Sequence, residues 1–252
     1  MIKKFDVYIT PFHLTRKIHL YLPDDYDQSE ERYPVIYMYD GHNLFFDHDA
    51  TYGKSWGFKD YLDHEDKKFI VVGMECNHEG RQRLDEYSPY TVMNSYLGDI
   101  HGLGDIYMKW VVEELKPYID AHYRTIPFRE CTMIGGSSMG GLMALYSVVK
   151  YNQYFSKAAC LSSAIGFCFD EIKKDILESQ LNPDTRVYLD WGSDESRNKQ
   201  ALAYASARNL EVSHILNQKQ VSTYPYLIIN GQHNEATWEK QIPIFMHYLW
   251  KE

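Results

Sequence analysis

Short apolar runs alternate with amphipathic segments along most of this 252-residue chain. Runs of four to six mostly apolar residues predict strands buried on both faces, whereas apolar residues that recur every three or four positions predict helices packed on a sheet. We expect the buried strands at residues 34–39, 69–73, 131–134, 157–161, 186–189 and 224–229. We expect the helices at residues 55–64, 105–121, 142–146, 170–178, 198–212 and 237–249, the first of them capped by Ser55. The helix at 105–121 should bury one face, which carries Ile106, Trp110, Val111, Leu115, Tyr118 and Ile119.

The N-terminal region has a different pattern. Residues 4–10 and 17–22 alternate polar and apolar positions, which predicts half-exposed antiparallel strands at one edge of the sheet. Residues 75–95 show no period and are expected to form a long surface loop. Strands regularly separated by helices predict an α/β fold, with a mostly parallel central sheet and helices on both faces, formed by residues 1–252 as a single domain.

A cluster of small residues joins one predicted strand to the next helix. Here Gly136-Ser137-Ser138-Met139-Gly140 fits the pattern G-x-S-x-G. In this pattern the serine lies on a sharp strand-to-helix turn, and glycines flank it because larger side chains would collide with the neighbouring strand and helix. Ser138 would then lie at a helix N-terminus, where the helix dipole and the Met139 amide favour a developing negative charge. The pattern predicts a nucleophile for acyl transfer, and a glycine-rich packing turn is the alternative.

A serine nucleophile needs a base, and the base needs a carboxylate to orient it. In hydrolases with this turn, the acid and then the histidine follow later strands. The predicted strand at 186–189 is followed by a loop with Asp194 and Glu195, and the strand at 224–229 is followed by His233. We expect His233 to be the base and one of the two carboxylates to be the acid. The backbone amide of His42, after the strand at 34–39, is the expected second oxyanion donor.

Five stretches together resemble the putative esterase family, the esterase D-like branch of the α/β-hydrolases. They are YMYDGHNLF at 37–45, RLDEYSP at 83–89, GSSMGG at 136–141, VYLDWGSDE at 187–195 and GQHNEATW at 231–238. The resemblance covers nearly the whole chain and implies an α/β-hydrolase fold and a serine carboxylesterase without a cofactor. By position it makes Ser138 the nucleophile, His233 the base, and Met139 and His42 the oxyanion donors. It favours Glu195 as the acid, because the family acid follows the loop glycine by three residues.

The expected reaction is hydrolysis of carboxylic esters or thioesters through an acyl-enzyme on Ser138. An acyltransferase, in which a sugar or alcohol replaces water, would use the same acyl-enzyme and is the alternative. A non-catalytic binding module is disfavoured because all three triad positions hold competent residues.

Aromatic residues make up 15% of the chain, and several fall in segments expected near the loop-bearing rim of the sheet. We expect these residues to line an aromatic-walled substrate cleft: Tyr52, Trp56, Tyr87, Tyr90 and Trp238. The alternative is that their rings pack in the core.

The charge and the apolar pattern of the chain limit the classes of partner that we expect. The net charge is -9, with 26 basic and 35 acidic residues, and no Lys or Arg run forms the basic footprint that nucleic-acid binding needs. No apolar run reaches membrane-spanning length, and the N-terminus lacks the apolar core of a signal peptide. We expect a cytoplasmic protein whose partner is a small-molecule ester, and the sequence leaves homo-oligomerisation open.

No metal site is predicted. The four cysteines lack C-x-x-C spacing, so buried thiols are expected at Cys76, Cys131, Cys160 and Cys168, with a disulfide between the last two left open. Residues 47–49, Asp-His-Asp, are expected to be a solvated loop, because three adjacent residues rarely converge on one ion.

Overall fold

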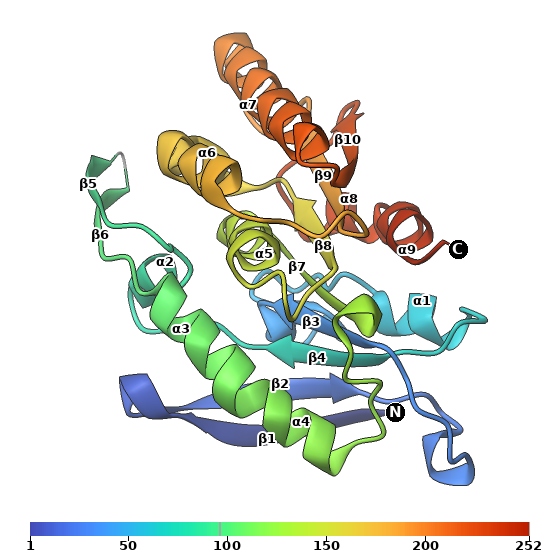
Figure 1. The fold of residues 1–252 in the computed structure, drawn as a ribbon. Coiled ribbons are helices and arrows are strands. Elements are labelled where there is room, and N and C mark those ends of the chain that lie inside the picture. Colours follow the sequence, from blue (N-terminus) through green and yellow to red (C-terminus); the bar gives the residue numbers. More distant parts are fainter. Residues whose placement is uncertain (96, 252) are drawn as a thin grey trace.

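The computed structural model describes residues 1–95 and 97–251, and within them eight strands form one sheet in the order β1-β2-β4-β3-β7-β8-β9-β10 (Figure 1). The neighbouring strands from β4 to β10 are parallel, whereas β1 pairs with β2, and β2 with β4, in antiparallel fashion. This confirms the predicted parallel sheet with an antiparallel N-terminal edge. The strands are β1 (Ile2–Ile9), β2 (Leu14–Tyr21), β3 (Val35–Tyr39), β4 (Ile70–Met74), β7 (Thr132–Ser137), β8 (Lys157–Leu161), β9 (Arg186–Gly192) and β10 (Ser222–Ile228).

Helices cover both faces of the sheet, as predicted (Figure 1). One layer consists of α3 (Gly104–Trp110), α4 (Lys116–His122), α5 (Met139–Lys150), α6 (Phe169–Glu178) and α7 (Lys199–Gln218). The other consists of α1 (Phe58–Asp63), α8 (Glu235–Glu239) and α9 (Ile242–Trp250). A short hairpin of β5 (Val92–Ser95) and β6 (Gly98–Ile100) lies apart from the main sheet.

The sheet separates two apolar cores. In β3, Val35, Tyr37 and Tyr39 pack in the larger core with α3, α4 and α5, whereas Ile36 and Met38 pack in the smaller core with α1 and α9. Every residue of β3 is buried because both of its faces are covered. This explains the continuous apolar run in the sequence.

The segment predicted as one helix at 105–121 is more complex. A π-helical turn at Val111–Leu115 joins α3 to α4. Trp110, Val111, Leu115 and Ile119 are buried as predicted, whereas Ile106 and Tyr118, expected on the same face, are exposed. Pro117 does not end the helical segment, and it lies in the first turn of α4, directly after the π-helical turn.

Three other predicted segments differ from the structure. The expected loop at 75–95 contains the short helix α2 (Gln82–Glu86) and strand β5. The expected closing helix at 237–249 is divided into α8 and α9, with Pro243 in the first turn of α9. The helix expected from Ser55 begins at Phe58, because the Ser55 amide and hydroxyl both donate to Asp47 at 2.8 Å instead of capping the helix.

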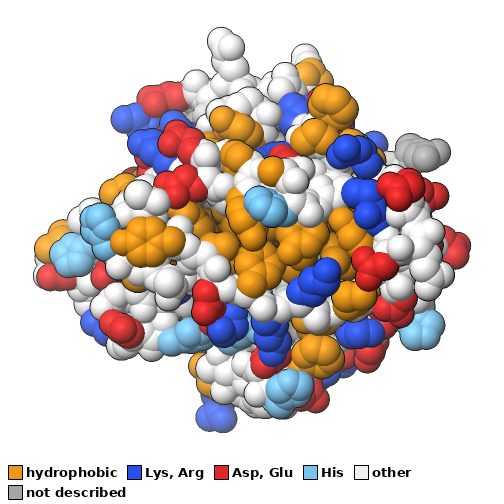
Figure 2. Space-filling view, turned by 90° about the horizontal axis from the view of Figure 1, so that it is seen from below, with side chains coloured by type: hydrophobic (Ala, Val, Ile, Leu, Met, Phe, Trp, Pro, Cys, Tyr) orange, Lys and Arg blue, Asp and Glu red, His pale blue; other side chains and the backbone are white. Residues whose placement is uncertain are grey.

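The side of the molecule that carries β1 and β2 is shown in Figure 2. Hydrophobic side chains gather in the middle of this face, and charged side chains surround them. Because β1 is at one end of the strand order, this edge is far in the sheet from β9 and β10, whose loops carry the predicted acid and histidine. In the described part of the chain, none of the helices combines the length and apolar character that crossing a bilayer requires.

Candidate active site

The predicted nucleophile lies at the junction of β7 and α5. Ser138 has φ 57° and ψ -121°, a conformation that non-glycine residues rarely adopt. Its amide donates to the carbonyl of Leu161 on β8 at 2.9 Å, which holds the turn against the sheet. A Cβ atom on Gly136 would lie 2.8 Å from the backbone carbon of Gly140, so the turn requires a glycine there. These features are those of the strained turn that presents a catalytic serine.

The loops after β9 and β10 are tied together by their backbones. Gly192 pairs with Ile228 at the ends of the two parallel strands. The Asp194 amide donates to the Gly231 carbonyl at 2.9 Å, and the Asn230 amide donates to the Ser193 hydroxyl at 2.8 Å. The acid loop and the histidine loop therefore form one structural unit.

Within this unit, Glu195 and His233 form a hydrogen-bonded pair. Oε2 of Glu195 lies 2.9 Å from Nδ1 of His233, and Oε1 accepts from the Gly192 amide at 2.6 Å. Burial by itself raises the pKa of Glu195, but the hydrogen bonds from His233 and the Gly192 amide outweigh this effect and hold the pKa below its ordinary value. Asp194 contacts the Ser193 hydroxyl at 3.5 Å instead. The structure thus brings Glu195, and not Asp194, to His233.

Ser138 and His233 line the same cavity, which has a volume of about 520 Å³. The described residues show no hydrogen bond between the Ser138 hydroxyl and His233. Catalytic hydrogen bonds often tighten only when substrate is bound. The structure therefore places a serine and a histidine on one cavity, with a carboxylate hydrogen-bonded to the histidine.

The loop after β3 carries the predicted second oxyanion donor. His42 lies in a 3-10 turn at Gly41–Asn43 and lines the cavity together with Ser138. Its ring is buried, which lowers its pKa and favours the neutral imidazole, and Nε2 lies 2.9 Å from the Thr51 hydroxyl. Met139 is the first residue of α5 and is buried directly after Ser138. Of the two predicted donor residues, Met139 therefore directly follows Ser138, and His42 lines the same cavity as Ser138.

The aromatic residues predicted to bind substrate divide into two groups. Tyr52 and Trp238 line the cavity, and the Trp238 ring lies 5.3 Å from the His233 ring. Trp56 is buried against Trp238, with ring centroids 5.7 Å apart, and Tyr87 is fully buried with its hydroxyl accepting from the Asp40 amide at 3.2 Å. These last two residues pack in the apolar cores and are not among the lining residues of the cavity.

Tyr90 also lies away from the cavity. Its hydroxyl donates to Asp175 on α6 at 2.6 Å, and its ring packs edge-on against Tyr146. It ties the segment before β5 to the helical layer, which is a packing role.

Several polar cavity residues were not singled out from the sequence. Arg83 holds the buried carboxylate of Asp40 through two hydrogen bonds of 2.8 and 2.6 Å. Glu235 is buried on the same cavity, and its pKa is raised by burial and then by the nearby Asp40 carboxylate. The only sequence signal for these residues was their place in stretches that resemble the esterase family. Cys76 and His78 also line the cavity, and they carried no signal of their own.

A family model described as "Putative esterase" matches residues 12–247 of the chain. The chain belongs to this esterase family. Family membership makes it a carboxylic ester hydrolase, in agreement with the resemblance seen in its motifs. That the whole chain is a single domain stays a prediction.

The individual relatives are distant. The chain is 26% identical to the uncharacterized protein YbbA of Bacillus subtilis over 190 residues, which cover 74% of this chain and 72% of that protein. It is 29% identical to the esterase Rv1288 of Mycobacterium tuberculosis over 142 residues, which cover 56% of this chain but only 28% of that protein. Among solved structures, an IroE-like serine hydrolase from Shewanella oneidensis superposes with a TM-score of 0.79 at 18% identity and covers 100% of this chain and 80% of that one. At this identity the structural likeness establishes the fold alone.

Proposed function

We propose that this esterase hydrolyses its substrates through an acyl-enzyme on Ser138. The observation that carries the proposal is the Glu195–His233 pair, which opens on the same cavity as a serine held in the strained turn. A carboxylate that accepts from Nδ1 leaves Nε2 of the imidazole free to accept a proton from the serine.

In the first half of the reaction, Oγ of Ser138 attacks the acyl carbonyl carbon and its proton passes to Nε2 of His233. The carbonyl oxygen becomes an oxyanion, which the backbone amides of Met139 and His42 stabilise. The imidazolium then returns the proton to the leaving alcohol as the C–O bond breaks. Glu195 stays ionised throughout, because its pKa is held low, and stabilises the imidazolium.

In the second half, water replaces the alcohol. His233 takes a proton from the water as its oxygen attacks the acyl carbon, and the same two amides stabilise the second oxyanion. Collapse of this intermediate releases the carboxylic acid and returns the proton to Ser138. A sugar or alcohol at the position of the water would give transfer instead, so product analysis with and without an acceptor separates the two outcomes.

The cavity favours small, polar esters. At about 520 Å³ it is large enough for a short acyl or aromatic acyl group with a modest alcohol. Its lining includes polar side chains that are only partly buried, among them Asn43, Asn77 and Arg83, and their desolvation by a long alkyl chain would be costly. Tyr52, which lines the cavity and is largely exposed, offers a flat apolar surface for an aromatic ring. We infer a preference for short or aromatic acyl esters over long-chain lipids.

The test is a panel of aryl, short acyl, aromatic acyl and long-chain esters and acyl thioesters, assayed with the wild type and with Ser138→Ala. Ser163→Ala, which changes a nearby serine outside the cavity lining, is the matched control. The proposal expects hydrolysis of short esters that falls to near background in Ser138→Ala and persists in the control. Full activity in Ser138→Ala would refute the proposal, and a preference for long-chain esters would refute the substrate class.

A further inference from the structure

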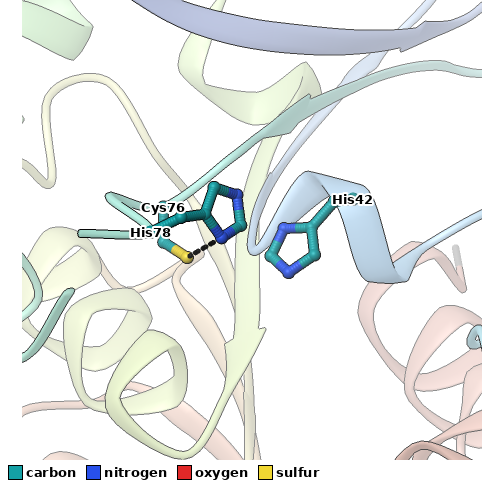
Figure 3. Close-up of side chains that lie close together, drawn as sticks. All are labelled: His42, Cys76 and His78. Atoms are coloured by element: carbon teal, nitrogen blue, oxygen red, sulfur yellow. Dashed lines mark hydrogen bonds between the residues drawn. The ribbon is translucent and has the colours of Figure 1, made fainter. Parts of the chain in front are cut away.

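Beside the predicted catalytic residues, three side chains that the reaction does not use converge on one wall of the cavity. They are His42, from the loop after β3, and Cys76 and His78, from the loop after β4 (Figure 3). Because β3 and β4 are adjacent parallel strands whose ends pair at Tyr39 and Met74, the two loops leave the sheet side by side.

We propose that His42, Cys76 and His78 bind a single divalent transition-metal ion of the Zn²⁺ class. A thiolate and two imidazoles form a donor set that suits Zn²⁺ and related borderline ions and is poor for Mg²⁺ or Ca²⁺. Three protein ligands would leave a fourth position open toward the cavity. The proposal goes beyond ester hydrolysis and does not depend on it.

The spacing of the donor atoms fits one ion. Sγ of Cys76 lies 3.9 Å from Nδ1 of His78. Two such atoms on a tetrahedral zinc are about 3.6 Å apart, given bond lengths near 2.3 Å to sulfur and 2.0 Å to nitrogen. One donor atom from each of the three residues lies within 4.8 Å of the others, so closing the site needs shifts of about an ångström.

The most specific sign is a buried nitrogen of His42. The His42 side chain is 5% exposed, and its Nδ1 has no hydrogen-bond partner among the described residues, whereas Nε2 is held by Thr51. The His42 and His78 rings face each other edge-on with centroids 4.7 Å apart (Figure 3). A simple thiol–imidazole contact would explain Cys76 and His78 but would leave Nδ1 of His42 without a partner in a buried site, which is unfavourable. A metal ion would satisfy all three groups.

The outer contacts are those of a metal site. A metal-binding histidine usually donates its second ring N–H to a carboxylate, a backbone carbonyl or water, which fixes the ring, and a hydroxyl oxygen can accept in the same way. His42 has the Thr51 hydroxyl in this role, and His78 has Glu75, whose Oε2 lies 3.3 Å from Nε2. Oε1 of Glu75 in turn lies 2.7 Å from Nε2 of His19, which anchors the carboxylate. On binding, Cys76 would lose its proton to solvent and form the metal–sulfur bond as thiolate.

Cobalt titration tests the proposal, because Co²⁺ enters zinc sites and reports thiolate binding by absorption. The chelator-treated protein should bind one Co²⁺ per chain with a sulfur-to-cobalt charge-transfer band, and Zn²⁺ should displace it. Cys76→Ser should abolish the band, whereas Cys131→Ser, at a half-buried cysteine elsewhere, should keep it. Ser138→Ala should bind the metal normally, which separates this result from any failure of the catalytic proposal.

Two further variants keep the test informative even if Cys76→Ser fails to fold. The His78 side chain is 54% exposed, so His78→Gln should fold and should weaken Zn²⁺ binding at least about tenfold, as should Glu75→Gln through the outer contact. His48→Gln, at an exposed histidine outside the cavity lining, is the matched control and should bind as the wild type does. Absence of Co²⁺ binding, binding without the thiolate band, or equal affinity in His78→Gln and His48→Gln would overturn the proposal.

Discussion

Nδ1 of His233 lies 2.9 Å from Oε2 of Glu195, a residue 38 positions earlier in the chain. The contact depends on the parallel pairing of β9 and β10, which places the two loops at the same edge of the sheet. The second carboxylate oxygen is held by the Gly192 amide, so the group cannot rotate away without losing a hydrogen bond. This pair gives the imidazole a fixed orientation and defines which carboxylate serves the proposed reaction.

Glu195→Gln should lower kcat by about three to four orders of magnitude, because the amide cannot stabilise the imidazolium or hold the correct tautomer. Asp194→Asn should retain activity within about twofold, since an exposed loop carboxylate contributes little. Steady-state kinetics on one short ester, with circular dichroism to confirm folding, compares the two. If Asp194→Asn is the inactive variant, the acid is Asp194, and if both are active, Ser138 and His233 work as a dyad.

Removal of Arg83 should destabilise the protein, because it leaves the Asp40 carboxylate buried without its partner. We expect Arg83→Gln to lower the free energy of unfolding at pH 7 by about 3 kcal/mol, the lower end of the range for buried pairs, since Arg83 is itself partly exposed. Lys68→Gln, which breaks the exposed pair with Asp25, should leave the free energy of unfolding nearly unchanged, because solvent screens this pair. Urea unfolding measures both, and equal losses would contradict this account of the Asp40–Arg83 pair.

The same variant has a defined pH dependence. In the wild type, burial raises the pKa of Asp40, but Arg83 more than compensates and holds the pKa below the ordinary 3.8. This stabilisation is present above about pH 4 and is lost as the pH falls through the folded-state pKa. Without Arg83, burial raises the pKa of Asp40, so the variant should lose stability as the pH rises. The gap between wild type and Arg83→Gln should therefore widen from pH 4.5 to pH 7, and a constant gap would contradict the assignment.

Tyr52 offers a direct test of the aromatic substrate surface. It lines the cavity but is 82% exposed, so Tyr52→Ala should leave stability unchanged. We expect kcat/KM to fall about two- to tenfold for aromatic acyl esters, as expected for loss of one aromatic contact, and to change little for acetyl esters. Tyr204→Ala, at an exposed tyrosine on α7, is the control. Equal effects on both substrate classes would mean that Tyr52 does not contact the acyl group.

The fold and the catalytic loops were predictable because the signals are local. Each parallel strand is a short apolar run, and Ser138, Glu195 and His233 each follow such a run within a few residues. The choice of Glu195 over Asp194 came from the resemblance to the esterase family, because spacing alone left both open. The paired glycines around Ser138 also follow from the turn itself.

Other features depend on packing between distant segments. The π-helical turn at Val111–Leu115 has no local signature in the sequence, and it was not predicted. Tyr87 falls in a segment without a period, and Trp56 lies at the start of a predicted helix, so only the folded chain shows that both rings are buried. The convergence of Cys76 and His78 with His42 requires the pairing of β3 with β4, which no cysteine or histidine spacing reveals.

The central claim is that Ser138 is the activated nucleophile, and covalent labelling tests it most directly. A fluorophosphonate should add one group to the wild type, mapped by peptide mass spectrometry to Ser138, and the rate of labelling should fall sharply in Glu195→Gln. Label on Ser137 or Ser163, or no label on protein that hydrolyses esters, would contradict the account.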